Sequence, residues 1–152
     1  MEPHYYNIDV EWIEGRKGII SSKELDLKIG IAVPPPFYKG VEGIWSPEHL
    51  LTAAVSGCFM TTFLGIAENS KLDFLTFNSS AHGKLEQVDG KYLMTEIILQ
   101  PVVVIRNEKD KEKTERILHK AESACLITNS IKIKTTLNAV VRIEINQEQS
   151  AA

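Results

Sequence analysis

The stretch from Ser46 to about Asn69 constrains the fold more than any other part of the sequence. Ser46 can cap a helix, Pro47 suits the first helical position, and Glu48 complements the positive end of the helix dipole. The residues from His49 onward are apolar on nearly every helical face, with only small polar side chains among them. Such a helix is about 35 Å long and typical of the buried centre of a domain. The small polar residues favour a core helix over a membrane-spanning one.

The segments that flank this helix alternate between apolar and polar residues, which is the pattern of half-buried β-strands. The alternation covers Tyr6–Ile13 and Leu25–Ile31 before the helix, and Leu72–Ile105 after it. Asp89-Gly90 divides the last of these and is a strong signal for a hairpin turn. Between the early strands and the helix, Pro34-Pro35-Pro36 is incompatible with a helix and predicts a loop.

The C-terminal third begins with a second helix. Asp110 to Ala124 is amphipathic, and we expect Thr128-Asn129-Ser130 to break the helical pattern. Ile131–Ile145 is predicted to form a final strand or a bent pair of strands. Because strands and helices are segregated along the chain, the fold class is α+β, with antiparallel sheets around the central helix.

Length and composition narrow the possible functions. The 152 residues fit one domain, 1–152, and we expect residues 146–152 to form a frayed tail. The net charge of −3 argues against nucleic-acid binding, and two cysteines are too few for a disulfide-rich scaffold. The N-terminus has no signal-peptide pattern, and we expect no apolar run to reach the ~20 residues of a membrane span. These features predict a cytoplasmic protein that does not bind membranes.

Cys58 lies near the middle of the central helix, ten residues after Glu48. That separation puts both on broadly the same helical face, ~15 Å apart, so a third group is needed to connect them. Arg16, in the turn Gly15–Gly18, is the best candidate. Each residue also has a structural explanation: Cys58 as core packing, Glu48 as a helix-dipole residue, and Arg16 as a solvated side chain. The second cysteine, Cys125, ends the amphipathic helix and is equally compatible with packing.

The segment Ser46-Pro47-Glu48-His49-Leu50-Leu51-Thr52-Ala53-Ala54-Val55-Ser56-Gly57-Cys58-Phe59 resembles the signature of the OsmC/Ohr family. Two further motifs support the resemblance. Gly15-Arg16-Lys17-Gly18 is similar to the family's N-terminal arginine turn, and Glu122-Ser123-Ala124-Cys125 resembles the segment with its second cysteine. The order and spacing of these motifs cover nearly the whole chain.

The resemblance implies an intertwined homodimer that reduces organic hydroperoxides through thiol chemistry. By position, Cys58 would be the attacking cysteine, Cys125 the resolving cysteine, and Arg16 and Glu48 the activating pair. No bound cofactor is implied. The reductant would be an external dithiol, such as a lipoyl group or a lipoylated protein.

Elementary electrostatics supports an activating role for Arg16. A free thiol has a pKa of ~8.5, and burial raises it. Because the helix dipole acts only near helix ends, a cation is expected to be required for Cys58. An arginine at ~4 Å, in an effective dielectric of ~20, contributes about 4 kcal/mol. Glu48 would hold the guanidinium by a bidentate ion pair.

Two other functions remain open from the sequence. One is a dimeric binding protein for apolar ligands, in which Cys58 only lines the pocket. The other is a cysteine-dependent thioesterase or hydrolase, which is weaker because no motif places a histidine as the base for Cys58. Glu115, His119 and Glu122 share a helix face on which metal ligands could lie, but a solvated face is favoured.

Overall fold

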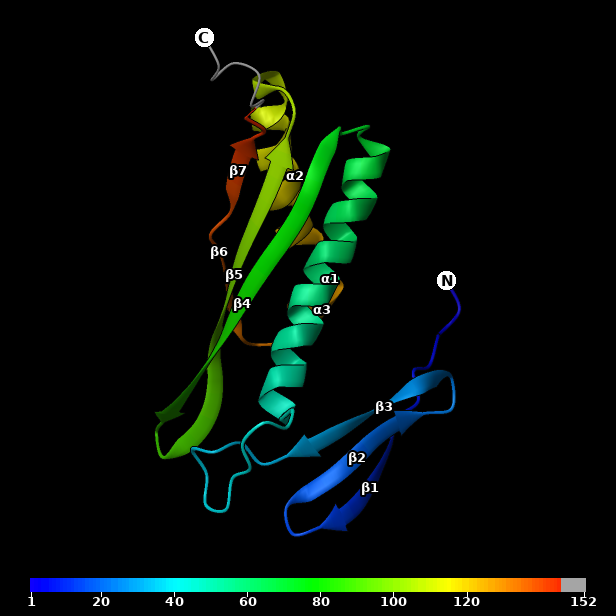
Figure 1. Cartoon of the computed structure of the whole chain (residues 1–152), viewed down its shortest axis with the longest axis vertical. Helices are drawn as coiled ribbons and strands as arrows, with labels where there is room; N and C mark the ends of the chain where they lie inside the picture. The colour runs from blue at the N-terminus through cyan, green and yellow to red at the C-terminus, as the bar shows by residue number, and fades with distance from the viewer. Residues whose placement is uncertain (146–152) are drawn as a thin grey trace. The chain divides into compact units, whose positions relative to one another are not determined.

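The computed structural model describes residues 1–145, so the predicted frayed tail at 146–152 lies outside the described residues. The chain forms two compact units, which meet between Leu51 and Thr52. The expectation of a single domain stays a prediction. The α+β class with one long helix and a second amphipathic helix is confirmed, and the elements are labelled in Figure 1.

The first unit contains a three-stranded antiparallel sheet in the order β1-β2-β3. The strands are β1 (Asp9–Glu14), β2 (Lys17–Ser22) and β3 (Leu25–Ala32). Gly15 in the β1–β2 turn has a φ of 51°, a left-handed conformation that glycine adopts without strain. The turn places Arg16 directly before β2. The strands expected here from the alternation are therefore present, but all six residues of β1 are exposed in the described chain, so its half-burial is not observed.

A folded loop connects β3 to the long helix. The amide of Ala32 donates to the carbonyl of Trp45 at 2.9 Å, which closes the two ends of the loop against each other. Inside it, a Cβ on Gly40 would lie 2.2 Å from the carbonyl oxygen of Pro34. Only glycine fits there without a backbone shift, so the proline-rich segment has a defined shape.

Helix α1 (Pro47–Asn69) begins where the sequence predicts. Ser46 is fully buried, and its Oγ accepts a hydrogen bond from the amide of His49 at 3.3 Å. The same Oγ lies 2.8 Å from Nδ1 of His49. This is the expected N-cap, because a serine side chain satisfies an amide of the first turn. It fixes the helical turn that carries Glu48.

The second unit is built on a long hairpin of β4 (Phe74–Val88) and β5 (Lys91–Ile105). Asp89 and Gly90 both have positive φ, as the predicted hairpin turn requires. Two short strands, β6 (Lys134–Leu137) and β7 (Val140–Ile143), pair with β5 in the parallel direction. The expectation of purely antiparallel sheets was therefore wrong for this sheet. The helices between β5 and β6 carry the chain back along β5, which permits parallel pairing.

The second helical region differs from the prediction at its end. A short 3-10 turn (Glu108–Asp110) leads into α2 (Lys111–Ala124), as expected from the amphipathic pattern. Cys125 is extended, with φ −63° and ψ 113°, and a further helical segment α3 (Leu126–Ser130) follows it. Thr128-Asn129-Ser130 was expected to break the helix, but these residues are helical. The interruption falls instead at Cys125.

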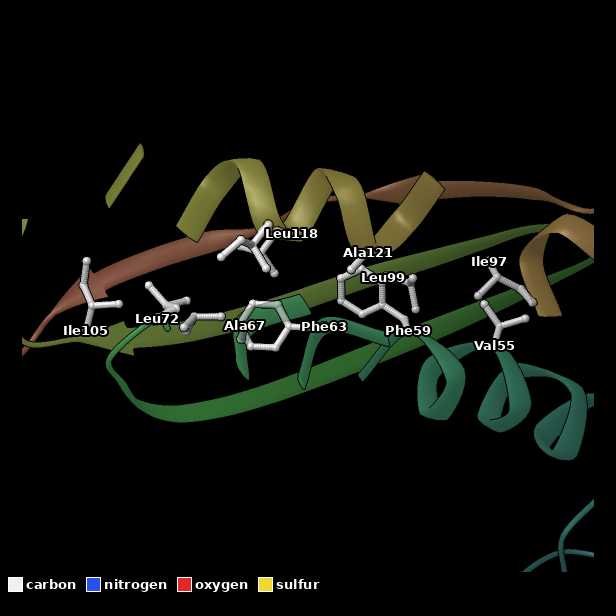
Figure 2. Close-up of a cluster of buried hydrophobic side chains, with 12 residues drawn as sticks. Val55, Phe59, Phe63, Ala67, Leu72, Ile97, Leu99, Ile105, Leu118 and Ala121 are labelled. Carbon is white, nitrogen blue, oxygen red and sulfur yellow. The ribbon is translucent and has the colours of Figure 1, made fainter. Parts of the chain in front are cut away.

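One face of α1 packs in the core of the second unit. Val55, Phe59, Phe63 and Ala67 of α1 are buried together with residues of β5 and α2, as Figure 2 shows. These four follow the four-residue spacing of one helical stripe. The expectation of burial on nearly all sides is not met within the described chain. Met60 and Leu64 are each 39% exposed.

Helix α1 is also long and apolar enough to cross a membrane by length and composition, with a mean hydropathy of 1.8. The expectation that no apolar run reaches this length was wrong. Its small residues hardly lower the hydropathy, and its charges lie near the ends, at Glu48 and Glu68. The core helix of a soluble protein can have the same length and hydropathy. The buried stripe of α1 packs in the core of the second unit.

Candidate functional site

The two cysteines of the chain face each other in the second unit. Cys58 lies near the middle of α1 and is half-buried, whereas Cys125 is fully buried between α2 and α3. Both are free thiols. The Cys125 side chain lies close enough to the Cys58 thiol to lower its pKa by hydrogen bonding. The structure therefore brings together two candidate residues that are 67 positions apart in the sequence.

The extended conformation of Cys125 places the start of α3 against Cys58. The backbone amides of Ile127 and Leu126 contribute to the lowered pKa of the Cys58 thiol. Amides in the first turn of a helix have no carbonyl partner within that helix, so they are available for such contacts. The carbonyl of Cys125 is used differently: it accepts from the amide of Asn129 at 3.0 Å, which closes the turn of α3.

Two threonines follow Cys58 on α1. Thr61 and Thr62 each donate a hydroxyl hydrogen bond to the carbonyl of Cys58, at 3.0 Å and 2.8 Å. Thr62 also lies within hydrogen-bonding reach of the Cys58 side chain. A hydroxyl has one proton, so Thr62 serves either the carbonyl or the sulfur at a given moment.

Burial has the largest single effect on the Cys58 thiol and raises its pKa. The amide of Ile127, the thiol of Cys125, the hydroxyl of Thr62 and the amide of Leu126 all lower it. Together these donors outweigh burial, so the pKa of Cys58 lies below its ordinary value of 9.0. The site therefore raises the share of thiolate above that of an ordinary cysteine, and the thiolate is the nucleophilic form.

Arg16 and Glu48 lie together in the first unit. They line a mostly apolar cavity of about 480 Å³, to which Trp12, Ile31 and Phe37 also contribute. The cavity holds a cation and a carboxylate within apolar walls. This combination suits a small apolar molecule that carries one polar group.

The bidentate ion pair between Arg16 and Glu48 stays a prediction, although both residues line the same cavity. The Arg16 guanidinium lies over the ring of Tyr38, 5.9 Å from its centroid. An aromatic face attracts a guanidinium, which gives a physical reason for this position. The sequence thus identified two residues that line one cavity, and their role as an activating pair stays a prediction.

The OsmC-like protein family model matches residues 40–139, which is well over half of the chain. The chain belongs to the OsmC-like family. It is 22% identical to the uncharacterized protein YmaD of Bacillus subtilis over 97% of this chain and all of that protein.

Solved structures of other OsmC-like proteins share the fold. A structure of an OsmC-like protein of unknown function from Vibrio cholerae has a TM-score of 0.80 and 24% identity, over 91% of this chain and all of that one. An organic hydroperoxide resistance protein from Elizabethkingia anophelis gives 0.73 and 19%, over 94% and 100% of the two chains. The organic hydroperoxide resistance protein OhrB of Bacillus subtilis gives 0.63 and 19%, over 90% and 98%.

Sequence reasoning missed the main-chain part of this OsmC-like site. We expected a cation to be required for Cys58, and this stays a prediction; the sequence did not indicate that groups beside Cys125 also lower the pKa of Cys58. The amides of Leu126 and Ile127 act on it because α3 begins directly after Cys125. A backbone amide cannot be recognised from the type of side chain that a residue carries. The short segment between Cys125 and Ile131 was the feature of the sequence that could have indicated these amides.

Proposed function

We propose that this OsmC-like protein is a thiol peroxidase that reduces organic hydroperoxides, with Cys58 as the attacking residue. The observation that carries the proposal is the contact between Cys58 and Cys125 within a set of donors that favours the thiolate. A nucleophilic sulfur beside a second thiol is the arrangement needed for oxidation to a disulfide. The family includes organic hydroperoxide resistance proteins, which supports the same chemistry.

In the first step, the Cys58 thiolate attacks the terminal oxygen of the hydroperoxide. The O–O bond breaks, the remaining alkoxide takes up a proton and leaves as an alcohol, and Cys58 becomes a sulfenic acid. In the second step, the Cys125 sulfur attacks the Cys58 sulfur. The S–O bond breaks, water leaves, and a Cys58–Cys125 disulfide forms.

A dithiol must then return the protein to its reduced state. One of its sulfurs attacks the disulfide to give a mixed disulfide, and its second sulfur releases the protein thiol. The dithiol becomes a disulfide, and Cys58 and Cys125 regain their protons. By family resemblance we expect a lipoyl group, free or on a lipoylated protein, and no bound cofactor. The reaction is proposed to occur in the cytoplasm.

Arg16 and Glu48 are proposed to assist this reaction as the activating pair of the family. Their support is the shared cavity, whose apolar lining matches the alkyl or aryl part of an organic hydroperoxide better than hydrogen peroxide. Arg16 would add a positive charge to the donors that already act on Cys58.

We also propose that the active form is a homodimer in which α1 packs against a second copy of the chain. Gly57 and Gly65 lie in helix α1, and nothing in the described chain lies within 4 Å of a Cβ built on either. A glycine inside a helix costs about 1 kcal/mol relative to alanine, so it needs a reason that the single chain does not provide. Close approach of a partner helix at this face, next to Met60 and Leu64, supplies one.

The test is turnover of cumene hydroperoxide with dihydrolipoamide as reductant. We expect the wild-type protein to consume the hydroperoxide and Cys58→Ser to abolish consumption. Ser56→Ala, a small change on the same helix, is the matched control and should retain activity. Absence of turnover in the wild-type protein would refute the peroxidase proposal.

The two other functions, an apolar-ligand-binding protein and a cysteine-dependent hydrolase, differ from the peroxidase in their expected results. An apolar-ligand-binding protein would bind an environment-sensitive apolar dye equally in wild type and Cys58→Ser, without turnover. A hydrolase needs a base for Cys58. In the described part of the second unit, the two histidines have other neighbours: His82 lies 3.0 Å from Gln100, and His119 lies 4.0 Å from Glu122.

A further inference from the structure

Two tight turns of the first unit bring the Arg16 guanidinium and the ring of Tyr38 together. Arg16 directly follows the left-handed glycine of the turn between β1 and β2. Tyr38 lies in the loop between β3 and α1, where the amide of Gly40 donates to the carbonyl of Phe37 at 2.9 Å and closes a turn around it. The guanidinium carbon of Arg16 lies 5.9 Å from the centroid of the Tyr38 ring.

The turn that carries Tyr38 is fixed by its neighbours. Lys39 has a φ of 58°, in the left-handed region that a residue with a side chain rarely adopts. Backbone strain of this kind persists only where the surrounding structure holds it in place. Here the amide of Val41 donates to the carbonyl of Val33 at 2.9 Å and closes the base of the loop. The loop therefore presents the Tyr38 side chain at a defined position, although Tyr38 is 77% exposed.

The ring of Tyr38 is suited to holding a cation. The face of an aromatic ring is partly negative, so it attracts a guanidinium or an ammonium group within about 6 Å. Nζ of Lys39 lies 5.4 Å from the same centroid, so the ring attracts two cations. Of these two, Arg16 also lines the cavity of about 480 Å³ in the first unit. Among the described residues, Tyr38 is not one that lines this cavity, so the contact with Arg16 connects its ring to the cavity.

We propose that Tyr38 is a positioning residue, whose ring holds the Arg16 guanidinium at the cavity before a hydroperoxide enters. This rests on the proposed function, in which Arg16 assists the attack of Cys58 on the hydroperoxide. A long arginine side chain loses much conformational freedom when it becomes ordered. A guanidinium that is already held loses less of that freedom when the hydroperoxide arrives, so the interaction is preorganised.

The first measurement follows Arg16 itself and needs no hydroperoxide. Phenylglyoxal modifies arginine side chains, and the rate at each arginine is read by mass spectrometry of its peptide. Tyr38→Leu removes the ring and keeps an apolar side chain. We expect it to make modification of Arg16 about two- to fivefold faster, the range of an exposed cation–π contact. Tyr38→Phe keeps the ring and should keep the wild-type rate. Arg116, whose side chain is 73% exposed on α2, is the internal reference.

Equal rates of Arg16 modification in wild type and Tyr38→Leu would overturn the proposal. Tyr38→Gln, a second variant without the ring, covers the case in which Tyr38→Leu does not fold. It should increase the rate at Arg16 like the leucine variant, and an unchanged rate would also overturn the proposal.

The second measurement tests whether the contact serves the reaction. We expect Tyr38→Leu to lower kcat/KM for cumene hydroperoxide about two- to fivefold, and Tyr38→Phe to retain it. The kcat/KM for dihydrolipoamide should not change, because Arg16 is proposed to act in the hydroperoxide step. Lys39→Met removes the other cation from the ring and leaves Arg16 on it, so it should lower neither value.

A double-mutant cycle separates action through Arg16 from a general effect on the loop. In an Arg16→Ala background, Tyr38→Leu should have no further effect on kcat/KM for cumene hydroperoxide. A loss of the same size in that background would overturn the proposal, because Tyr38 would then act on another group.

Failure of this inference and failure of the proposed function are distinguishable. Faster modification of Arg16 in Tyr38→Leu, in a protein that does not consume hydroperoxide, would uphold the positioning of Arg16 and refute the peroxidase. A wild-type protein that consumes hydroperoxide, with Arg16 modified equally in wild type and Tyr38→Leu, would refute the positioning role alone.

Discussion

Substitution of Cys125 separates its two roles, donation of a hydrogen bond to Cys58 and resolution of the oxidised sulfur. Cys125→Ala removes both the donor and the resolving thiol. Cys125→Ser removes the resolving thiol and keeps a side-chain donor at the same position. Because Cys125 is fully buried, neither variant adds a group that reaches solvent.

The expected size of the effect follows from the contact that is lost. A hydrogen bond to a charged group contributes about 1.5–3 kcal/mol, and a thiol is a weak donor, so the lower end applies. One pKa unit corresponds to 1.36 kcal/mol. We therefore expect Cys125→Ala to raise the pKa of Cys58 by about one unit. The pKa in Cys125→Ser should stay close to the wild-type value, because a hydroxyl is at least as good a donor.

The assay is pH-dependent alkylation of Cys58, read by mass spectrometry of its peptide. In a parallel experiment, excess cumene hydroperoxide is added without reductant. The wild-type protein should stop at the disulfide, whereas both variants should proceed from the sulfenic to the sulfinic acid. A wild-type pKa in Cys125→Ala would refute the donor role. Protection of Cys58 from overoxidation in Cys125→Ser would refute the resolving role.

Three further predictions concern stability, electrostatics and assembly. Because the folded state lowers the pKa of Cys58, the unfolded chain binds more protons between the folded pKa and 9.0. The difference in free energy of unfolding between wild type and Cys58→Ser should therefore rise with pH through that window and be constant below the folded pKa. Urea titrations that show no such rise would contradict the lowered pKa. Arg16→Ala should raise the pKa of Cys58 by about one unit or more. Lys17→Ala, which alters a neighbouring residue of the same cavity, should leave the pKa of Cys58 unchanged. Equal effects of the two substitutions in alkylation assays would argue against a specific role of Arg16 in activating Cys58. Gly57→Leu should weaken dimerisation in analytical ultracentrifugation. Lys120→Leu, on the exposed side of α2, should leave dimerisation unchanged. If neither variant changes dimerisation, this face of α1 is not the interface.

The parts of the fold that were predictable from the sequence have strong local signals. The N-cap at Ser46 and the turn at Asp89-Gly90 are formed as expected, because each depends on residues adjacent in the chain. The parallel pairing of β6 and β7 with β5 was not predicted, because it depends on long-range contacts that leave no local pattern.

The candidate site also has parts that were predictable from the sequence and parts that were not. Cys58 and Cys125 were identified by type and by motif, and the structure places their side chains in contact. The amides of Leu126 and Ile127 escaped prediction because any residue except proline carries one. The Arg16–Glu48 pair was inferred from charge and from the family resemblance, and neither source predicted that the guanidinium lies over the ring of Tyr38.

The most direct test of the central claim is a single oxidation of the reduced protein. One equivalent of cumene hydroperoxide is added without reductant, and the protein is analysed by intact mass and peptide mapping. The account predicts the loss of two hydrogen atoms, one Cys58–Cys125 disulfide and one equivalent of the corresponding alcohol. Unconsumed hydroperoxide with both thiols still free would contradict it.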